Sequence, residues 1–195
     1  MSARLLIVPG LGDSGPGHWQ SHVERAHAGA VRVHQSDWDA PDVGRWSDAV
    51  VRALPARPDG AILVAHSFGC FAAARAIRTN PRRIRAALLV APPDPRRLGA
   101  SASLPRTLLD PPAIVIASAN DPWCDLEVAR RLAKRWGAQF LSIGQAGHIN
   151  VDAGFGRWPL GERLVETLLR VYGTAARPRI APPPNSFTHH PGPTP

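Results

Sequence analysis

The sequence has little cysteine and no long apolar run, and each shortage excludes a class of protein. Two cysteines among 195 residues, Cys70 and Cys124, are too few for a disulfide scaffold. No apolar run approaches the roughly 18 residues that a membrane-spanning helix requires. The run at residues 5–9 is also shorter than the about 7–15 residues of a signal-peptide core. We therefore expect a cytoplasmic protein that does not insert into a membrane.

Lysine is almost absent, although basic residues outnumber acidic ones and give a formal net charge of +8. Of the 23 basic residues, only Lys134 is not arginine. Aromatic residues do not alternate with the basic clusters as base stacking would require, and no zinc-finger or RNA-recognition motif is present. A solvated basic surface explains clusters such as residues 130–135. We therefore predict no specific nucleic-acid partner.

The composition divides the chain into a folded domain and a tail. An apolar content of 44% is typical of a globular core, and the length suits one domain. Residues 173–195 hold seven of the 21 prolines and almost no large apolar side chains. Such a segment cannot bury enough surface to offset its ordering entropy. We therefore predict a domain over residues 1–172 and a mobile Pro-rich tail over residues 173–195.

Within the domain, short β-rich runs alternate with helix-length segments. The strand candidates are residues 4–8, 30–33, 61–65, 85–90, 113–118 and 139–143. The helix candidates are residues 18–26, 43–54, 68–79, 126–136 and 158–172. The strand candidates are continuous apolar runs, which are typical of strands buried on both faces. This order predicts an α/β fold with a mostly parallel sheet of about six strands and helices on both faces.

Ligands bind such sheets outside the carboxyl ends of the strands, so the residues after each strand are the informative ones. Ser67 follows the third strand candidate, in Ala65-His66-Ser67-Phe68-Gly69. A serine flanked by small residues on a strand-to-helix turn is typical of a nucleophile elbow, because the sharp bend crowds the positions two before and two after the serine. The alternative interpretation is a serine that caps the following helix.

A nucleophilic serine requires a base and a carboxylate that orients the base. Asp121 and His148 follow the fifth and sixth strand candidates, in the acid-then-histidine order of this architecture. His148 is the one histidine between His66 and the proline-rich tail. Asp94 also follows a strand candidate and is the alternative acid. We favour Asp121 because its strand directly precedes the histidine strand.

An oxyanion hole requires two backbone N–H groups directed at the developing negative charge. The amide of Phe68, directly after the serine, is one predicted donor. The loop after the first strand, residues 8–14, contains glycines that allow a tight turn. Leu11 is the expected second donor and Gly10 the alternative. No Gly-Lys-Ser/Thr follows this loop, which excludes a phosphate-binding loop.

No cofactor or metal is expected, because the histidines within residues 18–27 lack carboxylate or thiolate partners at ligand spacing. Trp19 and Trp123 lie beside two of the predicted catalytic loops and are candidate walls of a substrate pocket. Packing in the core explains both tryptophans equally well. His66 either lines the site or simply starts a helix.

Four motifs, taken in order, resemble those of the small serine hydrolases of the YdeN and retinoblastoma-binding protein nine family. The motifs are Pro9-Gly10-Leu11-Gly12-Asp13-Ser14 with His18-Trp19, Ala65-His66-Ser67-Phe68-Gly69, Asn120-Asp121-Pro122 and Gly147-His148-Ile149-Asn150. The resemblance spans about residues 4–172. It implies a compact α/β-hydrolase fold without a lid and a triad of Ser67, Asp121 and His148. Ala65 stands where the family usually has glycine, and the Leu-x-Cys-x-Glu motif tied to retinoblastoma binding is absent.

We therefore expect a serine hydrolase, most similar to carboxylesterases, that cleaves small ester, thioester or amide substrates through an acyl-enzyme. The expected partner is a small-molecule acyl substrate. Two alternatives remain open at this point, because neither the fold nor the triad determines the acceptor or the leaving group. One is a non-catalytic binding protein on a hydrolase fold, and the other is a peptidase or acyltransferase that uses the same triad.

Overall fold

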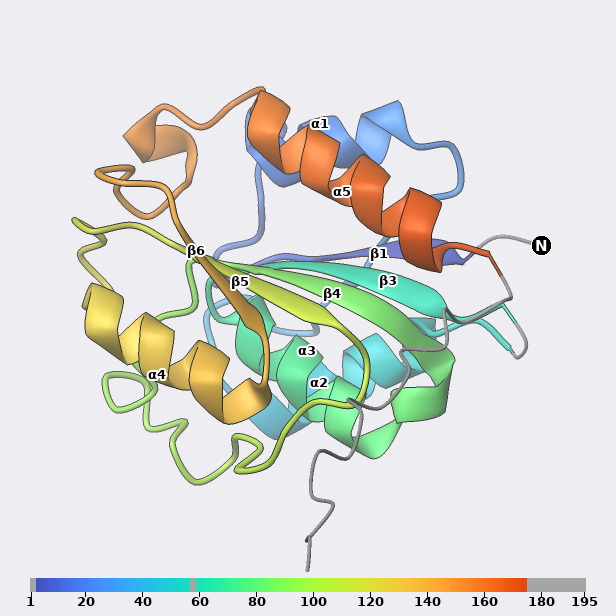
Figure 1. The fold of residues 1–195 in the computed structure, drawn as a ribbon, viewed down its shortest axis with the longest axis horizontal. Coiled ribbons are helices and arrows are strands. Elements are labelled where there is room, and N and C mark those ends of the chain that lie inside the picture. Colours follow the sequence, from blue (N-terminus) through green and yellow to red (C-terminus); the bar gives the residue numbers. More distant parts are fainter. Residues whose placement is uncertain (1–2, 57–58, 175–195) are drawn as a thin grey trace, which may run out of the picture.

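The computed structural model describes residues 3–56 and 59–174, which form a six-stranded sheet covered by helices (Figure 1). The strands are β1 (Arg4–Val8), β2 (Val31–Arg32), β3 (Ala61–His66), β4 (Ile84–Val90), β5 (Ala113–Ala117) and β6 (Gln139–Ser142). They lie in the order β2-β1-β3-β4-β5-β6, and every neighbouring pair is parallel. The predicted parallel sheet is confirmed. From residue 175 onward, the predicted tail lies outside the described residues.

The central strands are apolar throughout because both faces of the sheet are covered. Every residue of β3 is buried, and in β4 only Arg85 is not fully buried. β2 contains two residues rather than the predicted four, because it is an edge strand that pairs with β1 alone. The continuous apolar runs therefore identify the inner strands more accurately than the edge strand.

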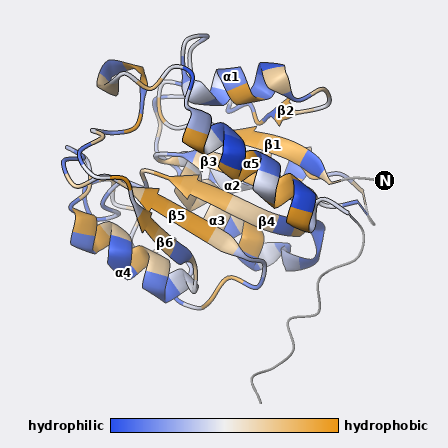
Figure 2. Ribbon diagram, turned by 45° about the horizontal axis from the view of Figure 1, so that its top comes forward, coloured by the Kyte–Doolittle hydropathy of each residue, from blue (hydrophilic) through white to orange (hydrophobic). Residues whose placement is uncertain are grey.

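The helices form a layer on each side of the sheet. The layer of α1 (Trp19–Ala26) and α5 (Pro159–Tyr172) lies opposite that of α2 (Val43–Ala53), α3 (Gly69–Thr79) and α4 (Leu126–Trp136) (Figure 1). Alternate residues of β1 serve the two layers: Leu6 and Val8 pack with α2 and α3, whereas Leu5 and Ile7 pack with α1 and α5. Figure 2 shows inner strands that are mostly apolar and helices of mixed character. Each fully buried Leu or Ile contributes about 1.5–3 kcal/mol to folding.

Parallel strands bring the predicted site residues together, because their carboxyl ends lie at one edge of the sheet. The loops after β1, β3, β5 and β6 all leave from this edge (Figure 1). The short 3-10 helix η2 (Val151–Ala153) belongs to the last of these loops. A second 3-10 helix, η1 (Pro81–Arg83), lies at the opposite edge, just before β4.

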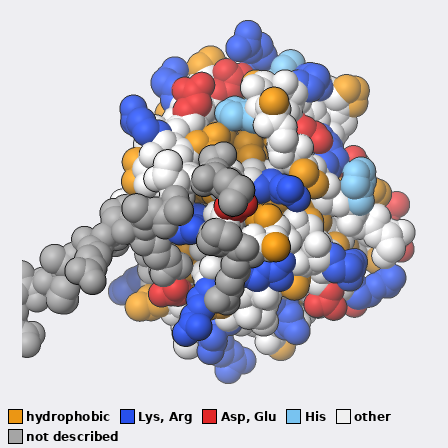
Figure 3. Space-filling view, turned by 90° about the vertical axis from the view of Figure 1, so that its right-hand side faces the viewer, with side chains coloured by type: hydrophobic (Ala, Val, Ile, Leu, Met, Phe, Trp, Pro, Cys, Tyr) orange, Lys and Arg blue, Asp and Glu red, His pale blue; other side chains and the backbone are white. Residues whose placement is uncertain are grey.

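One face of the molecule shows how its charged side chains are distributed. On the face shown in Figure 3, Lys and Arg side chains are interspersed with acidic and apolar ones.

Within residues 3–56 and 59–174, no helix combines the length and apolar character needed to cross a membrane. The same residues include no group of three or more His, Cys, Asp or Glu side chains able to hold a metal ion.

Candidate active site

Ser67 occupies a sharp turn between β3 and α3. Its φ of +52° is in the left-handed region, which a residue with a side chain adopts at an energetic cost. A Cβ on Gly69 would lie 2.3 Å from the carbonyl oxygen of Pro9 and 2.4 Å from that of Val8. Glycine therefore allows α3 to begin directly against the end of β1. Ala65 is fully buried, and the turn forms with its methyl group in place.

His148 lies between Ser67 and Asp121 and contacts both. Its Nε2 is 2.9 Å from the Oγ of Ser67, and its Nδ1 is 2.9 Å from each carboxylate oxygen of Asp121. Because an ionised carboxylate only accepts, Nδ1 donates, and in the neutral ring Nε2 accepts from the serine hydroxyl. The side chains of His148 and Asp121 are 10% and 2% exposed. Such burial strengthens the hydrogen bond between them.

Asp94, the alternative acid, is engaged by Arg96 instead. Its Oδ2 accepts from the Arg96 guanidinium at 2.9 Å, and its Oδ1 accepts from the Arg96 backbone N–H at 2.9 Å. The hydrogen bond from the Arg96 side chain lowers the pKa of the Asp94 carboxyl group. The backbone N–H of Asp94 donates to the carbonyl oxygen of Trp123, in the acid loop. The carboxylate in contact with His148 is therefore that of Asp121.

Ser118 and Asn120 connect the acid loop to the histidine loop, and neither was predicted to be a site residue. Ser118 Oγ donates to Asn120 Oδ1 at 2.7 Å and accepts from the backbone N–H of Ala146 at 2.9 Å. Asn120 Oδ1 also accepts from the backbone N–H of Gly147 at 2.8 Å. These bonds fix the two loops relative to each other. Asn120 belongs to the motif Asn120-Asp121-Pro122, whereas Ser118 is marked in the sequence only as a serine at the end of an apolar run.

The loop after β1 packs directly against the serine turn. A Cβ on Gly10 would lie 2.7 Å from the Cβ of Ser67, so this approach requires glycine. The predicted oxyanion donors are the backbone N–H groups of Leu11 and Phe68. Neither donates a hydrogen bond to any other part of the chain that the structure describes. Neither amide is therefore engaged elsewhere within the described residues.

Gln20 anchors this loop to the sheet from inside the protein. Its side chain is fully buried, and its Nε2 donates to the carbonyl oxygens of Val8 and Val64 at 3.2 and 2.9 Å. Its Oε1 accepts from the hydroxyl of Ser14 at 2.6 Å. The ends of β1 and β3 are thus joined through one side chain. No sequence pattern indicated this role, because glutamine in a short helix is usually exposed.

Arg32, on the edge strand β2, holds the same loop from the outside. Its guanidinium pairs with Asp13 at 2.7 Å and with Glu24 at 2.6 Å. It also donates to the carbonyl oxygen of Ser14 and to the hydroxyl of Ser21, each at 2.7 Å. The Arg32 side chain is only 12% exposed. We therefore regard it as part of the scaffold that fixes the loop after β1.

Two further histidines lie next to His148. The ring centroid of His66 is 5.0 Å from that of His148 and 4.8 Å from that of His18. The Nε2 of His66 is 2.9 Å from the backbone carbonyl oxygen of His148, which can only accept, so Nε2 donates. Burial is the main cause that lowers the pKa of both rings, to about 4 for His18. Both rings are therefore neutral at pH 7.

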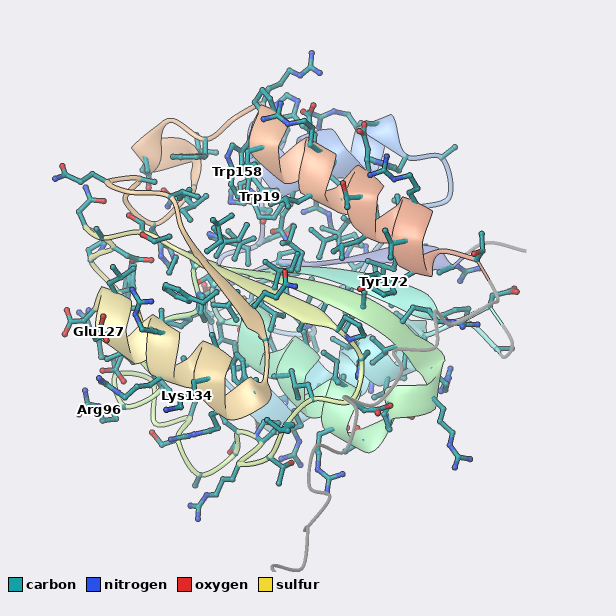
Figure 4. The ribbon with its side chains drawn as sticks, viewed as in Figure 1. Trp19, Arg96, Glu127, Lys134, Trp158 and Tyr172 are labelled. Atoms are coloured by element: carbon teal, nitrogen blue, oxygen red, sulfur yellow. The ribbon has the colours of Figure 1, made fainter. Side chains whose placement is uncertain are left out.

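The two tryptophans proposed as pocket walls occupy different environments. Trp19 is fully buried and packs edge-on against Trp158, with ring centroids 5.2 Å apart (Figure 4). Its Nε1 donates to the carbonyl oxygen of Ile149 at 3.0 Å. The pocket-wall prediction for Trp19 is wrong, because the ring fills the core beneath the histidine loop. Trp123 is 44% exposed, with its ring centroid 6.2 Å from that of His148, and stays a candidate wall.

A cavity of ≈200 Å³ opens beside Ser67. Drug-sized ligands usually occupy about 300–1,000 Å³, so this cavity suits a small group. Most of its lining residues are polar: Asp13, His18, His66, Ser67, His148 and Asn150.

Residues with strained backbone lie at the carboxyl edge of the sheet, and two of them, Asp13 and Ser67, line this cavity. Among the described residues, the non-glycine residues with positive φ are Asp13, Ser67, Ala91 and Ile149. They lie in the loops after β1, β3, β4 and β6, at the carboxyl edge of the sheet. Strained residues of this kind tend to cluster at functional sites.

Comparisons with known proteins identify the family of this chain. The model of the serine hydrolase family matches residues 5–167. A protein from Pectobacterium atrosepticum described as a YdeN-like hydrolase is 34% identical, with 88% of this chain and 94% of that chain covered and a TM-score of 0.82. No curated protein matches the sequence significantly.

More distant structures share the fold. The ydeN gene product of Bacillus subtilis is 20% identical, with a TM-score of 0.69 over 86% of this chain and 99% of that chain. The RedJ thioesterase of the prodiginine pathway in Streptomyces coelicolor is 18% identical, with a TM-score of 0.58 over 86% of this chain and 89% of that chain. Given the match to the family model and the 34% identity to its YdeN-like relative, this chain belongs to the serine hydrolase family as a YdeN-like α/β hydrolase.

Proposed function

We propose that this hydrolase cleaves small esters, thioesters or amides through an acyl-enzyme formed on Ser67. The observation that carries the proposal is the continuous contact from the Ser67 hydroxyl through His148 to the carboxylate of Asp121. A buried carboxylate that holds a histidine against a serine is the arrangement that activates the hydroxyl.

In the proposed reaction, the Oγ of Ser67 attacks the acyl carbonyl carbon while Nε2 of His148 takes the hydroxyl proton. Asp121 orients the ring and stabilises the imidazolium. The tetrahedral intermediate collapses as His148 returns the proton to the leaving alcohol, thiol or amine. Water, deprotonated by His148, then releases the acid and restores the Ser67 hydroxyl.

The amides of Leu11 and Phe68 are the proposed oxyanion donors. Both lie beside the serine turn and are unpaired within the described residues. The loss of one such donor typically lowers the rate by about 100- to 1,000-fold. The small cavity beside Ser67 favours short substrate groups over long acyl chains.

The test is labelling with a fluorophosphonate, which phosphonylates an activated serine and releases fluoride. Mass spectrometry should locate the adduct on Ser67 in the wild-type protein. The adduct should be absent from Ser67→Ala and much weaker in His148→Ala. A folded wild-type protein that is not labelled would contradict the proposal and favour a binding protein on a hydrolase fold.

The two candidate acids provide a matched control. Asp121→Asn should lower ester hydrolysis by several orders of magnitude, because the amide no longer stabilises the protonated ring. Asp94→Asn should leave hydrolysis close to wild type, since Asp94 contacts Arg96 and not His148. The opposite ranking would assign the acid to Asp94.

A panel of substrates distinguishes the remaining alternatives. Amine release from peptides would identify a peptidase, and acyl transfer to an added alcohol in preference to water would identify an acyltransferase. The proposal expects ester or thioester hydrolysis to exceed both.

A further inference from the structure

His18 has one ring nitrogen in a defined hydrogen bond and one without a partner. It is the N-cap of α1, where its Nδ1 accepts from the backbone N–H of Gln20 at 3.2 Å. Because Nδ1 accepts, the proton of the neutral ring lies on Nε2. That Nε2 is buried and has no hydrogen-bond partner among the described residues. The tautomer therefore leaves an unpaired N–H donor inside the protein.

An unpaired buried donor needs an explanation, because leaving it unsatisfied costs about 1–3 kcal/mol. His18 is only 5% exposed, and it is one of the residues that line the cavity beside Ser67. The neighbouring ring does not accept a hydrogen bond from this N–H. The His66 ring lies edge-on, with its centroid 4.8 Å from that of His18, and its Nε2 is itself a donor, to the backbone carbonyl oxygen of His148. A group that enters the cavity is the partner that the site still lacks.

The charge state of His18 suits a donor rather than a base. Burial, followed by the nearby Arg32 guanidinium, lowers the pKa of His18 to about 4. The ring is therefore neutral at pH 7, and its Nε2 carries a proton that it can donate. Its Nδ1 accepts the capping hydrogen bond from the Gln20 N–H, so a flip of the ring would break that hydrogen bond.

We propose that His18 binds the substrate, with its Nε2–H donating to an oxygen acceptor on the short group that occupies the cavity beside Ser67. This inference rests on the proposed function and adds a substrate class to it. The favoured substrates are esters whose short acyl or alkoxy group carries an ether, hydroxyl or carbonyl oxygen beyond the scissile bond. Purely aliphatic groups of the same size leave the donor unpaired.

Two pairs of esters of equal size test the preference, one on each side of the scissile bond. The acyl pair is 4-nitrophenyl methoxyacetate and 4-nitrophenyl butyrate. The alkoxy pair is 2-methoxyethyl acetate and n-butyl acetate, followed by pH-stat titration. Within each pair, the ratio of kcat/KM values in a variant is compared with the wild-type ratio. This comparison cancels the intrinsic reactivity of the esters.

His18→Asn and His18→Gln are the matched variants. Asparagine retains an oxygen that can cap the Gln20 N–H, but it is too short to replace Nε2. Glutamine places an amide N–H near the position of Nε2. We expect His18→Asn to lower the methoxy-to-alkyl ratio by about 3- to 10-fold in at least one pair, as the loss of one neutral hydrogen bond predicts. His18→Gln should retain more of the ratio.

A merely structural role for His18 would lower both members of a pair equally, so an unchanged ratio in His18→Asn overturns the inference. Equal falls in both variants would assign the effect to lost ring volume and also overturn it. Failure of the proposed function looks different, because Ser67 of the wild-type protein would then not react with the fluorophosphonate.

Discussion

Removing the hydroxyl of Ser118 should weaken both the fold and the active site. In Ser118→Ala, the backbone N–H of Ala146 loses its acceptor, and Ala146 is buried. An unsatisfied buried donor costs about 1–3 kcal/mol of unfolding free energy. Asn120→Ala leaves the N–H of Gly147 unpaired, but Gly147 is partly exposed and water replaces part of the bond. We expect a cost of about 0.5–1.5 kcal/mol for that variant.

The two costs should not add. Each single variant also removes the 2.7 Å hydrogen bond between Ser118 and Asn120, which a simple sum counts twice. The double variant should therefore be less destabilised than the sum by about 1 kcal/mol. Turnover should fall in all three variants, because the acid and histidine loops are no longer fixed relative to each other.

Urea titration followed by tryptophan fluorescence measures the unfolding free energies, and ester hydrolysis measures turnover. Ser101→Ala is the control, since Ser101 is exposed and should change stability by less than about 0.5 kcal/mol. Strict additivity, or a Ser118→Ala variant as stable and active as the control, would refute the idea that these side chains connect the loops.

Three further changes test other parts of the structure. Gly69→Ala places a Cβ against the carbonyl oxygens of Pro9 and Val8, so urea titration should show a loss of about 1–3 kcal/mol or more. Trp19→Phe removes the donor to the buried carbonyl of Ile149 and should cost about 1–3 kcal/mol and slow ester hydrolysis; unchanged values would contradict the role assigned to Trp19. The folded-state pKa of His18, about 4, lies below its unfolded value, so the unfolded chain binds the proton first and stability falls as the pH drops from 6.5 to 4. Between pH 7 and pH 4.5 the free energy of unfolding should fall by roughly 2 kcal/mol through His18, and this fall should shrink in His18→Asn.

Much of the fold could be predicted because burial on both faces leaves a clear pattern in the sequence. β3 and β4 are mostly apolar runs, and α2 and α4 each bury one apolar side. The edge strand β2 was overestimated because its residues are only half-buried. The order of strands in the sheet cannot be predicted from any single segment, since it depends on pairing between residues far apart in the chain.

The predicted site residues could be found because their chemistry requires particular residue types directly after strands. The residues that hold these site residues in place could not be found from the sequence. Gln20 and Ser118 act through buried hydrogen bonds to backbone groups, and no local pattern distinguishes such side chains from exposed ones. Trp19 was misplaced for a related reason: its proximity to the site in sequence does not reveal which face of α1 it occupies.

The all-parallel sheet has a consequence for how the chain folds as it is synthesised. No strand pairs with its neighbour through a tight hairpin, so every pairing waits for a crossover segment to be made, and folding of such topologies is comparatively slow. The helix that covers one face of the early strands, α5, is encoded at residues 159–172. Nascent chains that stop short of α5 therefore leave one face of β3 and β4 uncovered and expose Ile62, Val64 and Leu88. Such chains should be clients of chaperones that bind apolar segments, and truncation within α5 should send the protein to aggregation or proteolysis.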